Sequence, residues 1–291
     1  MPEGPEIETI RRGLELGAAG QEIAAVEVIS ERSFLAPRKL IDQIVVGARV
    51  SEVSRRAKVL MVGLDNGYTL LFHLKMTGQM VLVKAGGERY AGGHPSESMA
   101  AVLPDRSTRV VFRLGSGDAL YFNDQRRFGW IKLVPTTEVA ADPLVARLGP
   151  EVTAAEFSVA YLGSAMARHG RSPVKAVLLD QAVAAGVGNI YADESLHLAR
   201  IHPRRLAGSL SAAEVRRLHG AVREIIGLGI EHGGTSFSHY VNSFGGQGDY
   251  QEHARAYRRQ GQPCGVCGTV IEKIRVAGRG THFCPKCQVL S

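Results

Sequence analysis

The chain has 291 residues, of which 45% are hydrophobic, so it is long enough for a sizeable buried core and for more than one domain. No apolar run approaches the roughly 20 residues that span a bilayer, and charged residues of both signs are spread over the first fifteen positions. The sequence therefore argues against a membrane-spanning segment and a secretory signal, and it predicts a soluble, intracellular protein. Lys and Arg number 35 against 28 Asp and Glu, and the formal net charge of +7 favours a polyanionic partner.

The chain begins with a predicted helix over residues 2–16. Its first turn is rich in glutamate, which the helix dipole favours there, and three apolar residues follow at helical spacing, namely Ile7, Ile10 and Leu14. Pro2 is an ordinary residue for a helix start. It also has a second interpretation, because removal of Met1 would free its secondary amine, with an α-amino pKa of about 8. Such an amine is neutral at pH 7 far more often than a lysine, which makes it the better nucleophile, with Glu3 beside it as acid and base.

Short β-branched runs indicate an antiparallel β domain, a sandwich or a flattened barrel, over about residues 22–133. The clearest runs are residues 59–64, 68–74 and 109–114. Asn66-Gly67 lies between the first two and is a strong signal for a β-hairpin. The polar, glycine-rich stretch 84–105 is predicted as a long loop.

After Pro135 the strand pattern ends, and helices are predicted at residues 154–167, 174–180, 189–199 and 212–232. Ser211 and Glu214 form a capping box for the last of these helices, and Gly233-Gly234 ends it. From residue 236 to residue 262 neither period is convincing, and three glycines predict a mobile loop there.

All four cysteines lie close to the end of the chain, as Cys264-x2-Cys267, sixteen further residues, and Cys284-x2-Cys287. This is the spacing of a four-cysteine zinc site. Two disulfides are the alternative, which an intracellular chain without other cysteines disfavours. Four thiolates close the coordination sphere, so we expect one structural Zn²⁺ that folds a β-hairpin and performs no chemistry.

The zinc module is strongly basic, since residues 253–291 contain seven Lys or Arg and a single acid, Glu272. A hairpin would fix Arg275 and Arg279 where they can contact phosphates, although either arginine alone could equally be a solvated surface charge. We therefore expect an α+β multidomain protein in three parts: an N-terminal helix and β-sandwich domain at 1–135, a helical domain at 150–262, and a zinc β-hairpin at 263–291.

Motifs spread over the whole chain resemble the bacterial formamidopyrimidine-DNA glycosylase and endonuclease VIII family. Pro2-Glu3-Gly4-Pro5-Glu6 is similar to the family's catalytic terminus, which implies that the Pro2 amine attacks the anomeric carbon of the damaged nucleotide and that Glu3 handles protons. Arg55-Arg56-Ala57-Lys58 resembles the family's basic turn, which implies an essential Lys58 beside the lesion phosphate. Arg279 falls at the position of the family's zinc-hairpin arginine.

Two further segments resemble the loops that fill the hole left by a flipped base, namely His73-Leu74-Lys75-Met76-Thr77-Gly78 and Asn123-Asp124-Gln125-Arg126-Arg127-Phe128-Gly129. The resemblance implies that Met76 and Phe128 are apolar wedges, and that Arg126 hydrogen-bonds the opposite base, a cytosine. His73 belongs to the same predicted DNA-binding set. Without these motifs, a Met and a Phe in a β domain would be read as core residues.

In the helical half, Ser172-Pro173-Val174-Lys175 and the run from Gly186 to Ala192 resemble the family's helix, two turns, helix motif. Helix ends of this kind direct backbone N–H groups at phosphate. The resemblance implies that Asn189 binds the DNA backbone around the lesion and that Lys175 also contacts DNA. A plain helix N-cap is the alternative for Asn189.

The resemblance implies a bifunctional DNA glycosylase and AP lyase of base excision repair, which forms a Schiff base on Pro2 and nicks the strand by β,δ-elimination. Its partner would be double-stranded DNA with oxidised bases or abasic sites, and we expect a monomer in the bacterial cytoplasm, associated with the nucleoid. A zinc-hairpin DNA-binding protein without catalysis is the alternative from another class.

The two branches of the family that the chain resembles differ in the type of damaged base that they remove. The loop from Gln125 to Gly129 favours the formamidopyrimidine branch and oxidised purines such as 8-oxoguanine and formamidopyrimidines, whereas Gly4 resembles the endonuclease VIII branch and oxidised pyrimidines. The segment from Asn242 to Gln251, which is expected to close over the flipped base, lacks the Pro-Gly-Tyr-Phe run of the first branch. We expect oxidised purines.

Overall fold

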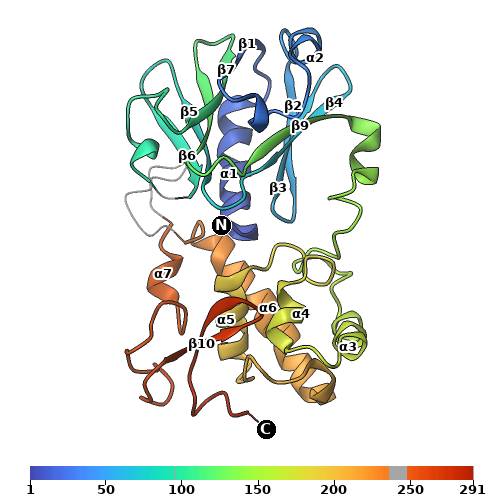
Figure 1. Cartoon of the computed structure of the whole chain (residues 1–291), viewed down its shortest axis with the longest axis vertical. Helices are drawn as coiled ribbons and strands as arrows, with labels where there is room; N and C mark the ends of the chain where they lie inside the picture. The colour runs from blue at the N-terminus through green and yellow to red at the C-terminus, as the bar shows by residue number, and fades with distance from the viewer. Residues whose placement is uncertain (95, 236–247, 291) are drawn as a thin grey trace. The chain divides into compact units, whose positions relative to one another are not determined.

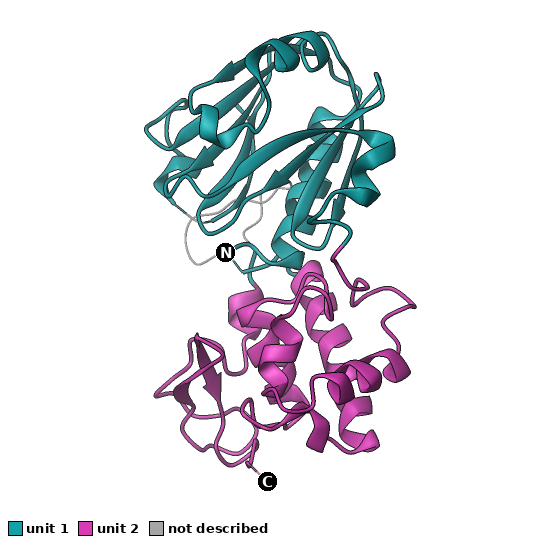
Figure 2. Ribbon diagram, turned by 45° about the vertical axis from the view of Figure 1, so that its right-hand side comes forward, with its two compact units in different colours: residues 1–146, 232–249 teal, residues 147–231, 250–291 magenta. Residues whose placement is uncertain are grey.

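The computed structural model of the chain describes residues 1–94, 96–235 and 248–290. The chain divides into two compact units, which Figure 2 draws in different colours. Unit 1 comprises residues 1–146 and 232–249, and unit 2 comprises residues 147–231 and 250–291. The three-part division expected above stays a prediction. Residues 236–247 lie outside the described residues. They include the first part of the expected mobile loop and residues 242–247 of the segment expected to close over a flipped base.

Unit 1 is a β-sandwich that begins with helix α1 (Gly4–Ala18). Its strands are β1 (Ile23–Val28), β2 (Val50–Arg56), β3 (Val59–Leu64), β4 (Tyr68–His73), β5 (Gly78–Val83), β6 (Arg89–Gly93), β7 (Thr108–Leu114), β8 (Ala119–Asp124) and β9 (Trp130–Pro135). One sheet has the order β1-β7-β8-β5-β6 and the other β2-β3-β4-β9, and every neighbouring pair is antiparallel. Helix α1 contacts β6 of the first sheet and β2 of the second (Figure 1).

One apolar core joins α1 to the inner faces of both sheets. Ile7 and Leu14 of α1 are buried in it, together with Phe72 of the four-stranded sheet and Phe112 of the five-stranded sheet, whose ring centroids lie 6.0 Å apart. A helix with one apolar stripe and strands with one apolar face bury that surface only against each other. The predicted N-terminal helix and antiparallel sandwich are confirmed.

The predicted hairpin at Asn66-Gly67 connects β3 to β4, and Gly67 has a φ of +84°, a conformation that glycine adopts without strain. The loop predicted at residues 84–105 is wrong in part, because this stretch contains β6 and a 3-10 turn, η2 (Glu97–Met99). Strand β6 has no alternating apolar pattern. It forms because its backbone pairs with β5 at the sheet edge, with Val83 opposite Arg89 and Gln79 opposite Gly93.

Three further short elements of unit 1 had no clear signal in the sequence. Helix α2 (Arg38–Ile44) and the 3-10 turn η1 (Glu31–Ser33) lie between β1 and β2, and η3 (Thr136–Ala141) follows β9. Each is shorter than three helical turns, so each has too few residues to show an apolar period.

Unit 2 is helical, as predicted after Pro135. Its helices are α3 (Val159–Arg168), α4 (Val174–Leu179), α5 (Asn189–Leu198), α6 (Ala212–Glu231) and α7 (Tyr250–His253), with a 3-10 turn η4 (Ala207–Ser209). The predicted capping box of α6 is present, since Glu214 N–H donates to Ser211 Oγ at 3.3 Å and Ser211 N–H donates to Glu214 Oε2 at 2.8 Å. Helix α3 begins five residues later than predicted, where Ser158 Oγ accepts the Tyr161 N–H.

A two-stranded hairpin of β10 (Glu272–Val276) and β11 (Arg279–Phe283) follows in unit 2. Ala277 and Gly278 form its turn, and both have positive φ, as a two-residue hairpin turn requires. The predicted zinc-module hairpin is therefore confirmed. Helix α7 lies in the stretch for which no period was evident, because its single turn is too short to show one.

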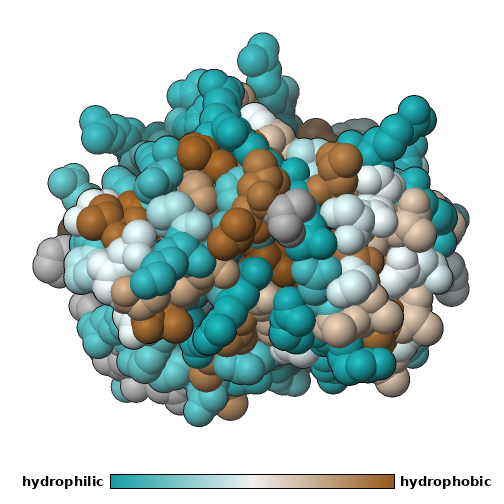
Figure 3. Space-filling model, turned by 90° about the horizontal axis from the view of Figure 1, so that it is seen from below, coloured by the Kyte–Doolittle hydropathy of each residue, from teal (hydrophilic) through white to brown (hydrophobic). Residues whose placement is uncertain are grey.

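The described surface of unit 2 exposes several large apolar side chains, namely Leu206, Val266, Val270, Val289 and Leu290. Figure 3 shows a face of the molecule on which hydrophobic residues occur in groups among hydrophilic ones. Exposed apolar residues of this kind are ordinary on a protein surface. Among the residues that the structure describes, no helix combines the length and the apolar character that a membrane crossing needs.

Candidate active site and zinc centre

The amino-terminal end of α1 is fixed by a glutamate that sequence analysis treated only as a helix-start acid. Glu6 Oε2 accepts the backbone N–H of Glu3 at 2.8 Å, and Glu6 Oε1 accepts both the N–H and the hydroxyl of Thr235 at 2.8 and 3.0 Å. Pro2 is buried, and Glu3 and Glu6 are only 4% and 8% exposed. The three-residue spacing from Glu3 to Glu6 could have indicated the first contact, but no local pattern indicates Thr235, which is 229 residues away.

Lys58 and His73 lie close together in unit 1. Lys58 is buried and occupies, with Ala57, the two-residue turn that connects β2 to β3. Burial, together with the positive charges of Lys75 and Lys58, lowers the pKa of His73 to about 3, so its imidazole is neutral at physiological pH. The backbone N–H of Lys75 donates to His73 Nδ1 at 3.1 Å, so the ring proton resides on Nε2, which can act only as a donor.

The predicted base-replacing side chains lie on two loops of unit 1. Arg126 and Phe128 are exposed, Phe128 to 53%, in the loop between β8 and β9, and Met76 is half-buried in the loop between β4 and β5. The guanidinium carbon of Arg126 lies 4.8 Å from the centre of the Phe128 ring. An exposed Phe stacked under an Arg is not a core residue, so the structure leaves Phe128 accessible to a ligand.

Lys175 in unit 2 is completely buried and faces an acid. Its Nζ lies 2.6 Å from Asp193 Oδ1, with both side chains 0% exposed, and it donates to Thr281 Oγ1 at 2.7 Å. Asp193 Oδ2 in turn accepts the His282 backbone N–H at 2.8 Å. The ammonium group therefore holds the zinc-module hairpin to α4 and α5. A DNA contact of Lys175 stays a prediction.

Asn189 is the first residue of α5, and the residue in the N-cap position is Gly188, so the N-cap alternative for Asn189 is wrong. Its side-chain Nδ2 instead donates to the carbonyl oxygen of Gly280, directly after Arg279, at 3.0 Å. Arg279 itself is exposed at the start of β11. Asn189 thus joins the two-turn motif to the hairpin that carries the predicted phosphate-binding arginine.

No sequence pattern indicated a role for Glu194, which is 0% exposed on α5. Its carboxylate accepts three successive backbone N–H groups, from Arg255 at 2.7 Å, Ala256 at 2.9 Å and Tyr257 at 2.7 Å. Burial raises the pKa of Glu194, and the three N–H donors oppose that rise. The glutamate ties residues 255–257, which precede the four cysteines, to α5, and no local sequence pattern indicates this contact.

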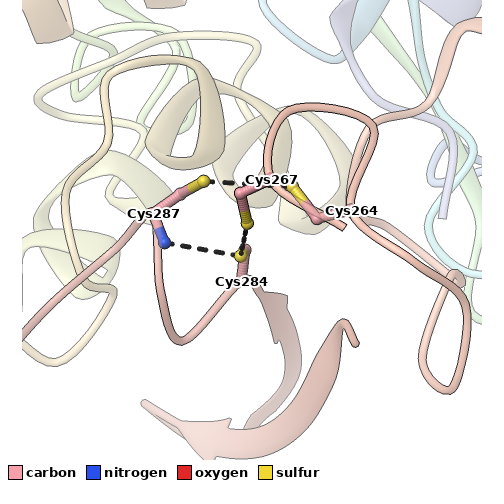
Figure 4. A group of neighbouring side chains, drawn as sticks. All are labelled: Cys264, Cys267, Cys284 and Cys287. Atoms are coloured by element: carbon pink, nitrogen blue, oxygen red, sulfur yellow. Dashed lines mark hydrogen bonds between the residues drawn. The ribbon is translucent and has the colours of Figure 1, made fainter. Parts of the chain in front are cut away.

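The four cysteines converge on one point of unit 2 (Figure 4). Their sulfur atoms all lie within 4.8 Å of one another, with 3.4 Å from Cys267 to Cys284 and 4.0 Å from Cys264 to Cys287. Disulfide sulfurs would be about 2.05 Å apart, whereas four sulfurs around a tetrahedral zinc are separated by about 3.8 Å. The disulfide alternative is wrong, since all four cysteines are free and the donor set fits one structural Zn²⁺.

A histidine on α5 reaches this centre. His197 Nε2 lies 3.4 Å from Cys264 Sγ, and both residues are 3% exposed. Burial and three nearby arginines lower the pKa of His197 to about 4, so the ring is neutral. A neutral imidazole beside a zinc-ligating thiolate can donate its Nε2 proton to the sulfur.

The predicted site residues are divided between the two units. Those in unit 1 are Pro2, Glu3, Lys58, His73, Met76, Arg126 and Phe128. Those in unit 2 are Lys175, Asn189, Arg279, Cys264, Cys267, Cys284 and Cys287. The functions of the first group, and those of Lys175, Asn189 and Arg279, stay predictions.

Three family models match the chain in order. They are described as the formamidopyrimidine-DNA glycosylase N-terminal domain over residues 1–131, the formamidopyrimidine-DNA glycosylase H2TH domain over residues 148–241, and a zinc finger found in FPG and IleRS over residues 261–289. The formamidopyrimidine-DNA glycosylase of Desulforamulus reducens is 42% identical, with 99% of each chain covered. That of Herpetosiphon aurantiacus is also 42% identical, over 99% of this chain and 100% of the relative.

Solved structures agree in fold. A Lactococcus lactis FPG variant in complex with Fapy-dG-containing DNA superposes with a TM-score of 0.87 at 33% identity and covers 99% of this chain and 100% of its own. The FPG protein of Thermus thermophilus gives a TM-score of 0.85 at 38% identity, with both chains fully covered. From its first residues to its zinc centre, the chain belongs to the formamidopyrimidine-DNA glycosylase family.

Proposed function

We propose that the protein is a bifunctional DNA glycosylase and AP lyase of base excision repair that removes oxidised purines, such as 8-oxoguanine and ring-opened guanine. The observation that carries this proposal is the full-length similarity to a Lactococcus lactis protein solved with Fapy-dG-containing DNA, in a chain that has Pro2 and Glu3 directly before α1. Its substrate is double-stranded DNA that contains such lesions or abasic sites.

The Pro2 nitrogen, once freed by removal of Met1, attacks the anomeric carbon of the damaged nucleotide. The new N–C bond replaces the bond to the base, which leaves with a proton, and opening of the sugar ring gives an iminium ion. Removal of a C2′ proton then expels the 3′ phosphate, and a second elimination expels the 5′ phosphate, which leaves a one-nucleotide gap. A single nucleophile therefore accounts for both base removal and strand cleavage.

Glu3 transfers protons in this reaction, because it directly follows Pro2 in the chain and is almost fully buried. Glu6 positions Glu3 by accepting its backbone N–H. Lys58 places a positive charge at the phosphate beside the lesion, and neutral His73 offers its Nε2 proton to an oxygen of the DNA backbone.

Met76, Arg126 and Phe128 enter the duplex where the damaged base has been extruded. Extrusion costs a few kcal/mol, which the apolar contacts of Met76 and Phe128 offset, while Arg126 hydrogen-bonds the orphaned cytosine. In unit 2, Asn189 and Arg279 bind phosphates, and Lys175 supports them. When bound, the zinc ion supplies folding energy to the hairpin that presents Arg279. The protein acts as a monomer in the bacterial cytoplasm, at the nucleoid.

Duplexes containing 8-oxoguanine, thymine glycol or an abasic site test the proposal. The expected result is rapid excision of 8-oxoguanine, slower excision of thymine glycol, and cleavage at the abasic site. Faster excision of thymine glycol would assign the protein to oxidised pyrimidines, which Gly4 and a Lactococcus lactis FPG complex with oxidised-pyrimidine DNA favour. An intact abasic strand with only a salt-dependent gel shift would identify a DNA-binding protein without catalysis.

A further inference from the structure

A buried carboxylate lies beneath the loop that carries Arg126 and Phe128. Asp124, the last residue of β8, is 0% exposed. Its Oδ2 accepts the Gly129 N–H at 2.6 Å, and its Oδ1 accepts the Arg126 N–H at 3.2 Å. One side chain thus binds the loop backbone at Arg126 and at Gly129, and the loop cannot shift without breaking hydrogen bonds to a buried carboxylate.

A threonine connects this carboxylate to the other loop. Thr77, which directly follows Met76, is 8% exposed and donates its hydroxyl proton to Asp124 Oδ1. The same hydroxyl oxygen accepts the Arg126 N–H at 3.0 Å. The loop with Met76 and the loop with Arg126 and Phe128 are therefore joined through a single hydroxyl group.

Both loops hold a residue in a conformation that L side chains rarely adopt. Lys75 has a φ of 49° and Arg127 a φ of 58°. Such left-handed residues persist only where surrounding contacts determine the backbone. Asp124 and Thr77 supply such contacts on either side of Arg127, which leaves Arg126 and Phe128 exposed in a fixed stack. The Lys75 N–H is instead held by His73 Nδ1.

We infer that Thr77 and Asp124 are positioning residues that hold the two loops as one preformed wedge, so that discrimination of the base opposite the lesion depends on them. The inference rests on the proposed function. A wedge that is ordered before DNA arrives loses little conformational entropy on insertion, and it presents the Arg126 donors at one depth and angle. A loosened wedge would still enter the duplex, but it would distinguish cytosine from other bases less well.

Thr77→Val removes the hydroxyl group and keeps the branched shape, and Thr77→Ser is the matched control that keeps the hydroxyl. Single-turnover excision is measured on 8-oxoguanine opposite cytosine and opposite adenine. We expect Thr77→Val to lower the cytosine-to-adenine rate ratio at least fivefold, with Thr77→Ser close to wild type. An unchanged ratio in Thr77→Val, including a uniform loss with both partners, would overturn the inference. A wild-type protein that excises neither duplex would instead refute the proposed function.

Amide hydrogen exchange in the DNA-free protein tests the hydrogen bonds of Thr77 and Asp124 to the loop backbone without measuring enzymatic activity. Wild type and Thr77→Ser should protect the Arg126 amide. In Thr77→Val and in Asp124→Asn, hydrogen exchange at the Arg126 or Gly129 amide should be at least tenfold faster than in wild type. In Asp124→Asn the side-chain oxygen can face Thr77, but the NH2 group that replaces the other oxygen cannot accept the Gly129 N–H. Wild-type protection at both amides in both variants would contradict the inference, whatever their activities.

Discussion

Replacement of Lys175 by methionine should destabilise unit 2 rather than remove a DNA contact. The substitution leaves Asp193 buried at 0% exposure without the ammonium group that lies 2.6 Å away, and it removes the donor to Thr281. Loss of one partner of a buried ion pair costs about 3–5 kcal/mol. We expect Lys175→Met to lower the free energy of unfolding by that amount, measured by chemical denaturation with zinc present.

Two control variants separate charge burial from other effects. Lys175→Met combined with Asp193→Asn removes both charges and keeps an acceptor for the His282 N–H, so it should recover most of the lost stability. Lys273→Met removes an exposed lysine from β10 and should change the stability by less than about 0.5 kcal/mol.

The salt dependence of DNA binding decides between a tether and a phosphate contact. Each phosphate contact contributes about 0.9 to the slope of log K against log salt concentration. We expect Arg279→Ala to reduce the magnitude of this negative slope by about that amount, and folded Lys175→Met to leave the slope unchanged. The slopes are measured by anisotropy titrations between about 50 and 200 mM salt. A Lys175→Met protein with wild-type stability and a slope lowered by about 0.9 would refute the reasoning.

Three further predictions follow from the same geometry. Removal of zinc by a chelator should unfold the hairpin and abolish the gel shift, with recovery on addition of Zn²⁺, since four thiolates hold the metal; a gel shift that survives complete zinc loss would contradict this role. The pKa of His73 is about 3 in the folded protein and 6.5 ordinarily, so the unfolded chain binds the proton more readily. The free energy of unfolding should therefore decrease as the pH falls from about 6.5 towards 3, and His73→Gln should make this decrease smaller. Phe128→Ala should slow 8-oxoguanine excision about tenfold or more while thermal stability stays near wild type, because the ring is 53% exposed.

The sequence predicted the parts of the fold that local chemistry determines. Helix α1, the hairpin at Asn66-Gly67, the capping box of α6 and the four-cysteine centre each depend on residues within a short distance along the chain. Strand β6 was missed because an edge strand is stabilised by the backbone of its neighbour, and its two glycines give no side-chain pattern.

The candidate site could also be predicted only where it depends on local sequence. The motifs identified residues by their resemblance to the family, but they did not identify the contacts with distant residues that hold these side chains in place. Three such contacts join separate parts of the chain: Glu6 accepts from Thr235, Glu194 accepts three N–H groups from residues 255–257, and Lys175 is buried against Asp193. No periodicity records such pairings, so they require the folded structure.

Borohydride trapping tests the central claim most directly. Protein with a native, Met1-processed terminus is mixed with an 8-oxoguanine duplex and borohydride, and the covalent adduct is mapped by mass spectrometry. The account predicts an adduct on the Pro2 nitrogen, and none with a chain extended in front of Met1, whose Pro2 nitrogen is an amide. An adduct on a lysine, or excision by the native protein without any adduct, would contradict it.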